Sequence, residues 1–212
     1  MISEGVSFTE EGLRVMSFLP ADTWYIVTGY ALGCLTTGYY LVKVLLGDDV
    51  RASGSRSAGA TNVGRRLGRT GFLFTFAGDF AKGVLAMLLA EWGGCSEAGL
   101  ALVLIAVVCG HIWPAPLRFK GGKGVATALG GMIVYDPVLT LIMAAACLPI
   151  YLVSKDRARS GIIVFPLVPV TALLLGRPFS TIASCFALAL LLLWTHRDNL
   201  AAISRGGGTG GR

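Results

Sequence analysis

The feature of this chain that most limits its possible folds is a succession of long apolar stretches separated by short polar ones. A helix needs about 20 mainly apolar residues to cross the hydrocarbon core of a bilayer, and fewer if the span is broken. Seven stretches are candidates, and they cover residues 24–47, 70–91, 97–114, 125–135, 137–153, 161–175 and 179–195. Only 14% of the residues are charged, whereas soluble domains carry about 25%. The sequence therefore predicts an all-α, polytopic integral membrane protein with about seven transmembrane helices.

The basic residues between these stretches predict the orientation of the helices. They are concentrated in alternate loops and in the C-terminal tail, as Arg51, Arg56, Arg65, Arg66, Arg69, Arg118, Lys120, Lys123, Lys155, Arg157, Arg159, Arg197, Arg205 and Arg212. The loops in between contain only Arg177. Because cytoplasmic loops are enriched in Lys and Arg, we expect the N-terminus outside and the C-terminus in the cytoplasm. The stretches 125–135 and 137–153 could instead form one kinked span around the proline of "YDP".

The chain shows no internal repeat and no boundary between domains. We expect a single membrane-embedded domain over 1–212, with an N-terminal surface segment at 1–22 and a flexible tail at 204–212. The net charge of +6 follows from the loop bias, so no nucleic-acid partner is expected. The five cysteines have no ligand spacing and there are two histidines, so neither a metal site nor another cofactor is predicted.

The first stretch that suggests chemistry is "SGSRSAGATNVGRRLG" at 53–68. Its glycines let backbone N–H groups approach a ligand, its hydroxyl groups donate hydrogen bonds, and arginine binds phosphate with two parallel bonds. The alternative is a flexible basic loop that serves only the orientation of the protein.

The second stretch is "FKGGKGVAT" at 119–127. A nucleotide-binding P-loop requires G-x-x-x-x-G-K-[ST], but Leu117 stands at the position of the first glycine and Gly124 follows Lys123. What remains is a glycine-rich turn with a lysine, leading into a helix whose N-terminus favours anions.

A third stretch, "HRDN" at 196–199, follows the last apolar run. His196 and Asn199 are three residues apart and share a face if the helix continues. Within the second apolar run, Asp79 and Lys82 have the same spacing. Charged residues inside a span usually pair or face a cavity, so this pair is either a structural ion pair or a support beneath an active site.

Three segments resemble, in this order, the motifs of the PlsY family of bacterial membrane acyltransferases: "GSRSAGATNVGRRLG", "GHIWPAPLRFKGGKGVATALGG" and "HRDNLAAISRGG". The "DFAKG" segment and the chain length are also similar to that family. The resemblance implies transfer of a fatty acyl group from acyl phosphate to the 1-hydroxyl of glycerol 3-phosphate, the first step of bacterial phospholipid synthesis. The H-x-x-x-x-D motif of acyl-CoA-type glycerolipid acyltransferases is absent from the sequence.

The resemblance implies a role for each matching residue. The catalytic set is Ser55, Arg65, Lys123, His196 and Asn199. The substrate- and phosphate-binding set is Gly59, Ala60, Thr61, Asn62, Gly121, Gly122, Gly124 and Ser160. The chain departs from the family pattern at Ser57-Ala58, where asparagine and proline are usual, and at Ala202 and Gly208 in the third motif.

These matches imply a multi-pass protein of the bacterial inner membrane, with its active site at the cytoplasmic face. The expected products are lysophosphatidic acid and phosphate, and we expect a monomer in the lipid bilayer. We also expect direct acyl transfer without a covalent acyl-enzyme, because no Ser-His-Asp arrangement can be identified in the sequence. The rival hypothesis is a transporter or channel for a phosphorylated metabolite, which would need charged residues along a path through the membrane.

Overall fold

The computed structural model describes residues 22–205, and all regular structure in that range is helical. The α-helices are α2 (Asp22–Cys34), α3 (Thr37–Leu46), α4 (Ala60–Trp92), α5 (Glu97–Ile112), α6 (Val125–Tyr135), α7 (Pro137–Ser154), α8 (Arg157–Val164), α9 (Leu167–Leu174), α10 (Phe179–Thr195) and α11 (Arg197–Ser204). Short 3-10 turns, η1 (Val50–Ala52) and η2 (Ala115–Leu117), lie in two of the loops. The N-terminal surface segment and nearly all of the predicted tail lie outside the described residues.

The predicted class of an all-α protein with apolar spans is confirmed for the described part of the chain. There, α4, α7 and the stretch Glu97–Leu117 are long and apolar enough to cross a membrane. The pairs α8–α9 and α10–α11 are each bent by more than 40° and raise the number to five if each pair forms one span. The predicted number of seven is therefore not reached by helix length and composition alone.

Several boundaries confirm the sequence analysis and others correct it. Helices α6 and α10 span the predicted residues 125–135 and 179–195, and α6 and α7 are separate helices. The prediction of one helix over 24–47 was wrong, because α2 ends at Cys34 and α3 begins at Thr37. The prediction of one helix over 161–175 was also wrong: α8 and α9 are bent by 41° at a break that contains Pro166, as expected for a residue that removes a helical hydrogen bond.

Helix α4 starts ten residues earlier than predicted, so the G-A-T-N sequence forms its N-cap and first turn rather than a loop. The helix is kinked at Gly68, whose φ of 66° and ψ of −161° are not helical. The kink separates the turns that carry the first motif from the apolar remainder of the helix.

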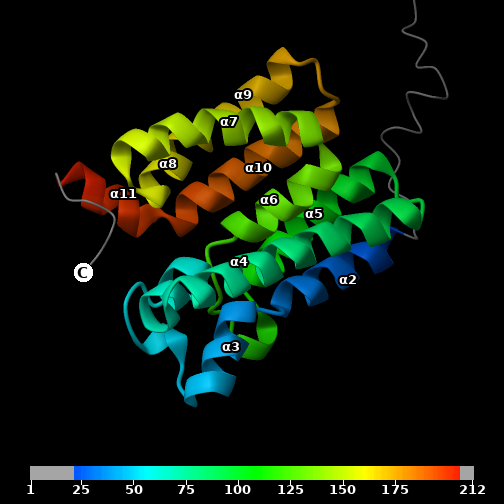
Figure 1. The fold of residues 1–212 in the computed structure, drawn as a ribbon. Coiled ribbons are helices and arrows are strands. Elements are labelled where there is room, and N and C mark those ends of the chain that lie inside the picture. The colour runs from blue at the N-terminus through cyan, green and yellow to red at the C-terminus, as the bar shows by residue number, and fades with distance from the viewer. Residues whose placement is uncertain (1–21, 206–212) are drawn as a thin grey trace, which may run out of the picture.

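Helices α2, α4, α5 and α6 pack against one another in what we call the tight side, and glycines allow the closest approaches (Figure 1). A Cβ atom added at Gly33 of α2 would lie 2.3 Å from a backbone oxygen of α5, and one added at Gly110 of α5 would lie 2.2 Å from a backbone oxygen of α2. The same holds between α4 and α6 at Gly83 and Gly130, at 2.3 and 2.0 Å. Any side chain at these positions would force the helices apart.

Helices α7, α8, α9 and α10 form a looser group, here called the open side (Figure 1). In the most apolar stretch of α7, 11% of the residues are buried inside the protein, compared with 56% in the stretch that contains α5. At the end of the molecule where α10 begins, an ion pair joins Arg177 to Asp136 at 2.8 Å, and Ser180 donates a hydrogen bond of 2.6 Å to Glu97. The three motifs lie at the other ends of these helices.

Candidate active site

Asn62 organises the loop that precedes α4. Its buried side-chain amide donates to the carbonyl oxygens of Val50, Ser53 and Ser57 at 2.8, 3.1 and 3.0 Å. Its Oδ1 accepts a hydrogen bond of 3.0 Å from the backbone N–H of Ser55. The family resemblance implied that Asn62 binds phosphate. Instead, its polar atoms are occupied within the loop, so the contacts give it the role of shaping the first motif.

The N-terminus of α4 presents the rest of the first motif. Gly59 is its N-cap, with φ −80° and ψ 161°, and Ala60 and Thr61 are its first helical residues. The first N–H groups of a helix have no partner within the helix and carry a partial positive charge. Arg65 lies on the next turn with an exposed side chain. The exposed Ser55 precedes the same helix, so this helix end offers hydroxyl, amide and guanidinium donors to an anion.

The second motif forms a loop that lies on the end of α5. The backbone N–H groups of Gly121 and Gly122 donate to the carbonyls of Ile112 and His111, each at 3.0 Å. A Cβ atom at Gly121 would lie 2.0 Å from the His111 carbonyl oxygen, so only glycine fits there. The family resemblance implied that these glycines bind substrate, but their N–H groups are used within the fold. Their absent side chains instead allow the loop to rest on α5.

The first and second motifs are joined by two sets of contacts. The N–H of Ala58 donates to the Gly121 carbonyl at 3.1 Å. Arg51 donates from Nη1 to the carbonyls of Leu117 and Lys120 at 2.9 and 2.8 Å, while its Nη2 pairs with Asp49 at 2.8 Å. From the sequence, Arg51 was assigned only to the charge bias of the loops. Nothing in the local sequence indicates its contact with the second motif, because the two carbonyls that it binds there lie 66 and 69 residues away.

Lys123 joins the second motif to the third. Its Nζ donates a hydrogen bond to Oδ1 of Asn199, and the Thr195 hydroxyl lies 3.1 Å from its carbonyl oxygen. The pKa of Lys123 is lowered, mainly because burial penalises its charge; Asp198 opposes this shift, and the positive charge of Arg65 adds to it. Arg65 and Lys123 therefore lie within electrostatic range of each other, as a pair of cations suited to phosphate.

His196 lies at the junction of α10 and α11 and is 5% exposed. Its Nδ1 is 2.8 Å from the carbonyl oxygen of Leu192. A carbonyl can only accept, so Nδ1 carries the proton and Nε2 has a free lone pair in the neutral ring. Its imidazole also packs on the ring of Phe165, with centroids 5.5 Å apart.

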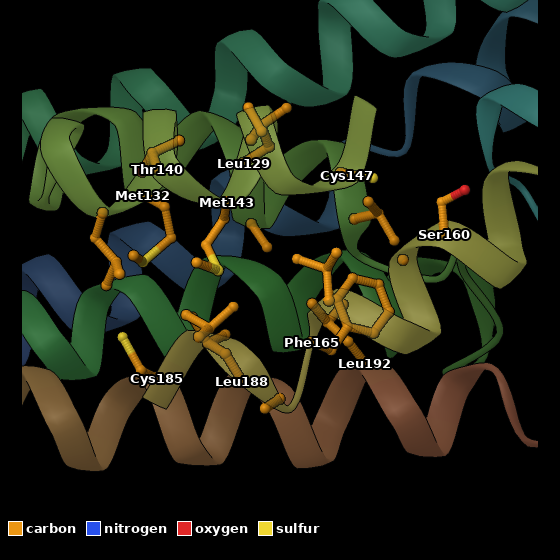
Figure 2. Close-up of a pocket in the computed structure, with 18 of the residues that line it drawn as sticks. Leu129, Met132, Thr140, Met143, Cys147, Ser160, Phe165, Cys185, Leu188 and Leu192 are labelled. Carbon is orange, nitrogen blue, oxygen red and sulfur yellow. The ribbon is translucent and has the colours of Figure 1, made fainter. Parts of the chain in front are cut away.

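A cavity of about 430 Å³ runs between helices α6 to α10. Figure 2 shows Ser160 at one end and Cys185 and Met132 toward the other, with Leu188, Met143 and Leu129 between them. His196 also lines the cavity. His196 follows Leu192 by one helical turn, and Cys185 lies two turns before Leu192. His196 is therefore at the same end of the cavity as Ser160. The cavity thus joins an apolar interior to a polar end.

Comparison with known proteins agrees with this arrangement. The family model described as glycerol-3-phosphate acyltransferase matches residues 23–206. The chain belongs to this family. A glycerol-3-phosphate acyltransferase of Desulfitobacterium hafniense is 44% identical over 179 residues, covering 84% of this chain and 89% of that protein. One of Thermus thermophilus is 38% identical over 192 residues, covering 89% and 94%.

Solved structures give the same result for the fold. The chain is similar to the crystal structure of PlsY, described as an integral membrane glycerol 3-phosphate acyltransferase, in its glycerol 3-phosphate form. The TM-score is 0.83 at 30% identity, with 89% of this chain and 94% of the other covered. The lysophosphatidic acid form of PlsY gives a TM-score of 0.80. The resemblance to the PlsY family inferred from the motifs is confirmed.

In this acyltransferase some of the predicted site residues lie together and others have separate positions. Lys123, Asn199 and His196 lie together at the junction of two motifs, and Ser160 shares the cavity with His196. The Ser160 hydroxyl donates to the Asp156 carbonyl at 2.8 Å. Gly124, with φ 87°, is the N-cap of α6 and turns the chain from the lysine into that helix. The apolar cavity was not predicted, because its lining comes from five helices, α6 to α10, whose packing no local pattern indicates.

Proposed function

We propose that this acyltransferase moves a fatty acyl group from acyl phosphate to the 1-hydroxyl of glycerol 3-phosphate, releasing lysophosphatidic acid and phosphate. The observation that carries the proposal is the meeting of a cationic, hydroxyl-rich site with the polar end of an apolar cavity. Acyl phosphate has the same two parts, an anionic head and an apolar tail. With its tail in the cavity, its reactive carbon would lie beside His196 and Ser160.

In the proposed reaction the 1-hydroxyl oxygen attacks the acyl carbon, a C–O bond forms, and the bond from that carbon to the phosphate oxygen breaks. Acyl phosphate is already activated, so the protein mainly has to align the two substrates and stabilise their phosphates and the developing oxyanion. The cations Lys123 and Arg65 and the N-terminus of α4 would supply this stabilisation. No cofactor takes part in this scheme.

The transfer is direct, without an acyl-enzyme. Among the hydrogen bonds of the described residues, the hydroxyl of Ser160 is bonded to the Asp156 carbonyl, and Nδ1 of His111 faces Lys82. Nδ1 of His196 faces the Leu192 carbonyl at 2.8 Å and lies 3.3 Å from the Thr195 hydroxyl, which itself is bonded to carbonyl oxygens. No histidine is therefore placed by these bonds to activate a serine.

The hydroxyl proton goes either to a substrate phosphate or to Nε2 of His196. Replacing His196 with Gln distinguishes the two. If Nε2 is the general base, kcat falls by about 10²- to 10⁴-fold. If a substrate phosphate accepts the proton, the loss is small and the pH profile of kcat keeps the titration of the substrate.

We further propose seven passes, counting α2–α3 and the short α6, with the N-terminus outside, the C-terminus in the cytoplasm, and the site at the cytoplasmic face of the bacterial inner membrane. The protein would act as a monomer. In a variant with its own cysteines replaced, a cysteine introduced at the exposed Ala52 should react with an impermeant thiol reagent only from the cytoplasm. A cysteine at the exposed Glu91 should react only from outside. Reversed labelling would overturn this orientation.

The direct test of function uses the purified protein with acyl phosphate and glycerol 3-phosphate, and measures lysophosphatidic acid by mass spectrometry. We expect product from acyl phosphate and none from acyl-CoA or acyl carrier protein. Comparable turnover with acyl-CoA would refute the proposed donor. Liposomes that contain the protein but no acyl donor should not take up glycerol 3-phosphate, whereas a transporter would move it.

A further inference from the structure

A cluster of buried charged and polar side chains lies beneath the second motif. Asp79 and Lys82 of α4 and His111 of α5 are 1%, 6% and 3% exposed. Lys82 Nζ is 3.1 Å from Asp79 Oδ1 and 2.9 Å from His111 Nδ1. Asp79 Oδ1 and His111 Nδ1 are 3.5 Å apart. None of the three lines the apolar cavity, so they are outside the site described above.

The cluster also closes the break between α2 and α3. Lys82 Nζ donates to the carbonyl oxygens of Gly33 and Leu35 at 2.8 and 2.9 Å. The backbone N–H of Thr37 donates to Asp79 Oδ1 at 3.3 Å. A helix end leaves carbonyl groups without helical partners, and here one ammonium group satisfies two of the carbonyls at this break.

The third contact of the cluster is with the glycine-rich loop. A Cβ atom added at Gly122 would lie 2.0 Å from Nε2 of His111. The φ angle of Gly122 is outside the left-handed region, so an alanine could adopt its backbone conformation. What excludes a side chain at Gly122 is therefore the imidazole ring itself. The hydrogen bond of 3.0 Å from the Gly122 N–H to the His111 carbonyl fixes the loop to the same residue.

We propose that Asp79, Lys82 and His111 are positioning residues: by holding the imidazole ring beneath Gly122, they set the position of the loop and hence of Lys123, the next residue. The inference rests on the proposed function, in which Lys123 binds a substrate phosphate. Burying an ion pair costs desolvation free energy, and an apolar replacement is often as stable. Lys82 also has a structural role, since its ammonium group satisfies two carbonyls at the α2–α3 break. That role does not require the contact between the His111 ring and Gly122, which points to placement of the loop that carries Lys123.

The first test is a double-mutant cycle between Gly122→Ala and His111→Ala. A displacement of about 1 Å can cost about a hundredfold in rate, so we expect Gly122→Ala to lower kcat/KM about a hundredfold when His111 is present. In the His111→Ala background the same change should cost much less, because the ring that repels the new Cβ is gone. Equal losses in both backgrounds would mean that Gly122 acts on the ligand directly, and would overturn the proposal.

The second test removes both charges together, in the variant Asp79→Asn with Lys82→Met, so that no unpaired charge stays buried. The matched control is Val107→Ala, a fully buried and uncharged position in α5, one turn before His111. Both are assayed well below their melting temperatures. We expect the charge variant to lose at least about tenfold in kcat/KM, with the same division between KM for glycerol 3-phosphate and kcat as in Lys123→Arg.

Two results separate the possible failures. If the wild-type protein makes no lysophosphatidic acid from acyl phosphate, the proposed function fails. If the wild type is active and the charge variant retains the activity of the Val107→Ala control, the proposed function stands and the positioning role is wrong.

Discussion

On the tight side of the molecule α4 and α6 approach so closely that a Cβ atom at Gly130 would lie 2.0 Å from a backbone oxygen. On the open side, by contrast, a cavity of about 430 Å³ separates α7 from α10. The tight side carries the first and second motifs, which present Arg65 and Lys123. The open side provides most of the cavity wall, and His196 and Asn199 follow its last helix.

The difference matches what each part of the proposed substrate requires. Binding a phosphate depends on hydrogen bonds whose lengths and angles have to be kept, so its ligands belong on rigid, closely packed helices. Burial of an acyl chain is non-directional and roughly proportional to the apolar area removed from water. A loosely packed set of helices can provide that burial.

The largest effect is expected where the tight packing is disturbed. Gly130→Ala adds one methyl group against the backbone of α4, and overpacking of this kind costs about 3 kcal/mol. We therefore expect a clear fall in the melting temperature in detergent and little active protein. The matched change on the open side is Ala144→Val, which adds two methyl groups at the cavity wall and should leave the melting temperature nearly unchanged. Similar losses in both variants would show that the two sides do not differ in packing.

An intermediate effect is expected at Arg65 and Lys123, the cations that we propose to bind phosphate. Arg65→Lys and Lys123→Arg keep the charges that orient the protein, but the first replaces a planar fork with a point charge and the second does the reverse. Losing one charged hydrogen bond costs about 1.5–3 kcal/mol, which corresponds to about tenfold to a hundredfold in kcat/KM.

The control for these variants is Arg69→Lys, which carries the same charge in the same helix outside the matched motif. It should be nearly silent. Full activity in both Arg65→Lys and Lys123→Arg would mean that these residues serve orientation alone.

The smallest effect is expected in the cavity. Cys185→Phe fills its far end and should shift the preference toward shorter acyl chains, by about 0.8 kcal/mol, or about fourfold in kcat/KM, for each methylene that no longer fits. Short-chain acyl phosphates should be used as before. A uniform loss for all chain lengths would indicate that the cavity does not hold the chain.

The same contrast explains how much of the structure was predictable from the sequence. Helices α6 and α10 have their predicted bounds because glycine or proline lies at their starts, and these residues act through local backbone geometry. The break between α2 and α3 was missed, because the ammonium group of Lys82 that satisfies its carbonyls is 47 and 49 residues away.

Within the site, chemistry was easier to predict than geometry. Lys123, His196 and Asn199 could be found from residue type and motif order, and the fold brings them together. The loop-shaping role of Asn62 could not be distinguished from phosphate binding, because an amide is suited to both. The contact of Arg51 with the second motif was missed, because a basic residue in this loop is already explained by the charge bias of cytoplasmic loops.

The most direct test of whether the cationic site and the cavity bind one substrate is to locate the acyl chain. A stable phosphonate analogue of acyl phosphate, with a diazirine at the end of its tail, would be photolysed with the protein and its attachment sites mapped by mass spectrometry. We predict labelling at the far end of the cavity, at Met132, Thr140 or Cys185, and less labelling in the Lys123→Ala variant. Labelling confined to the exposed apolar side chains of α3 or α9, unaffected by Lys123→Ala, would contradict the claim that the cationic site and the cavity hold one substrate.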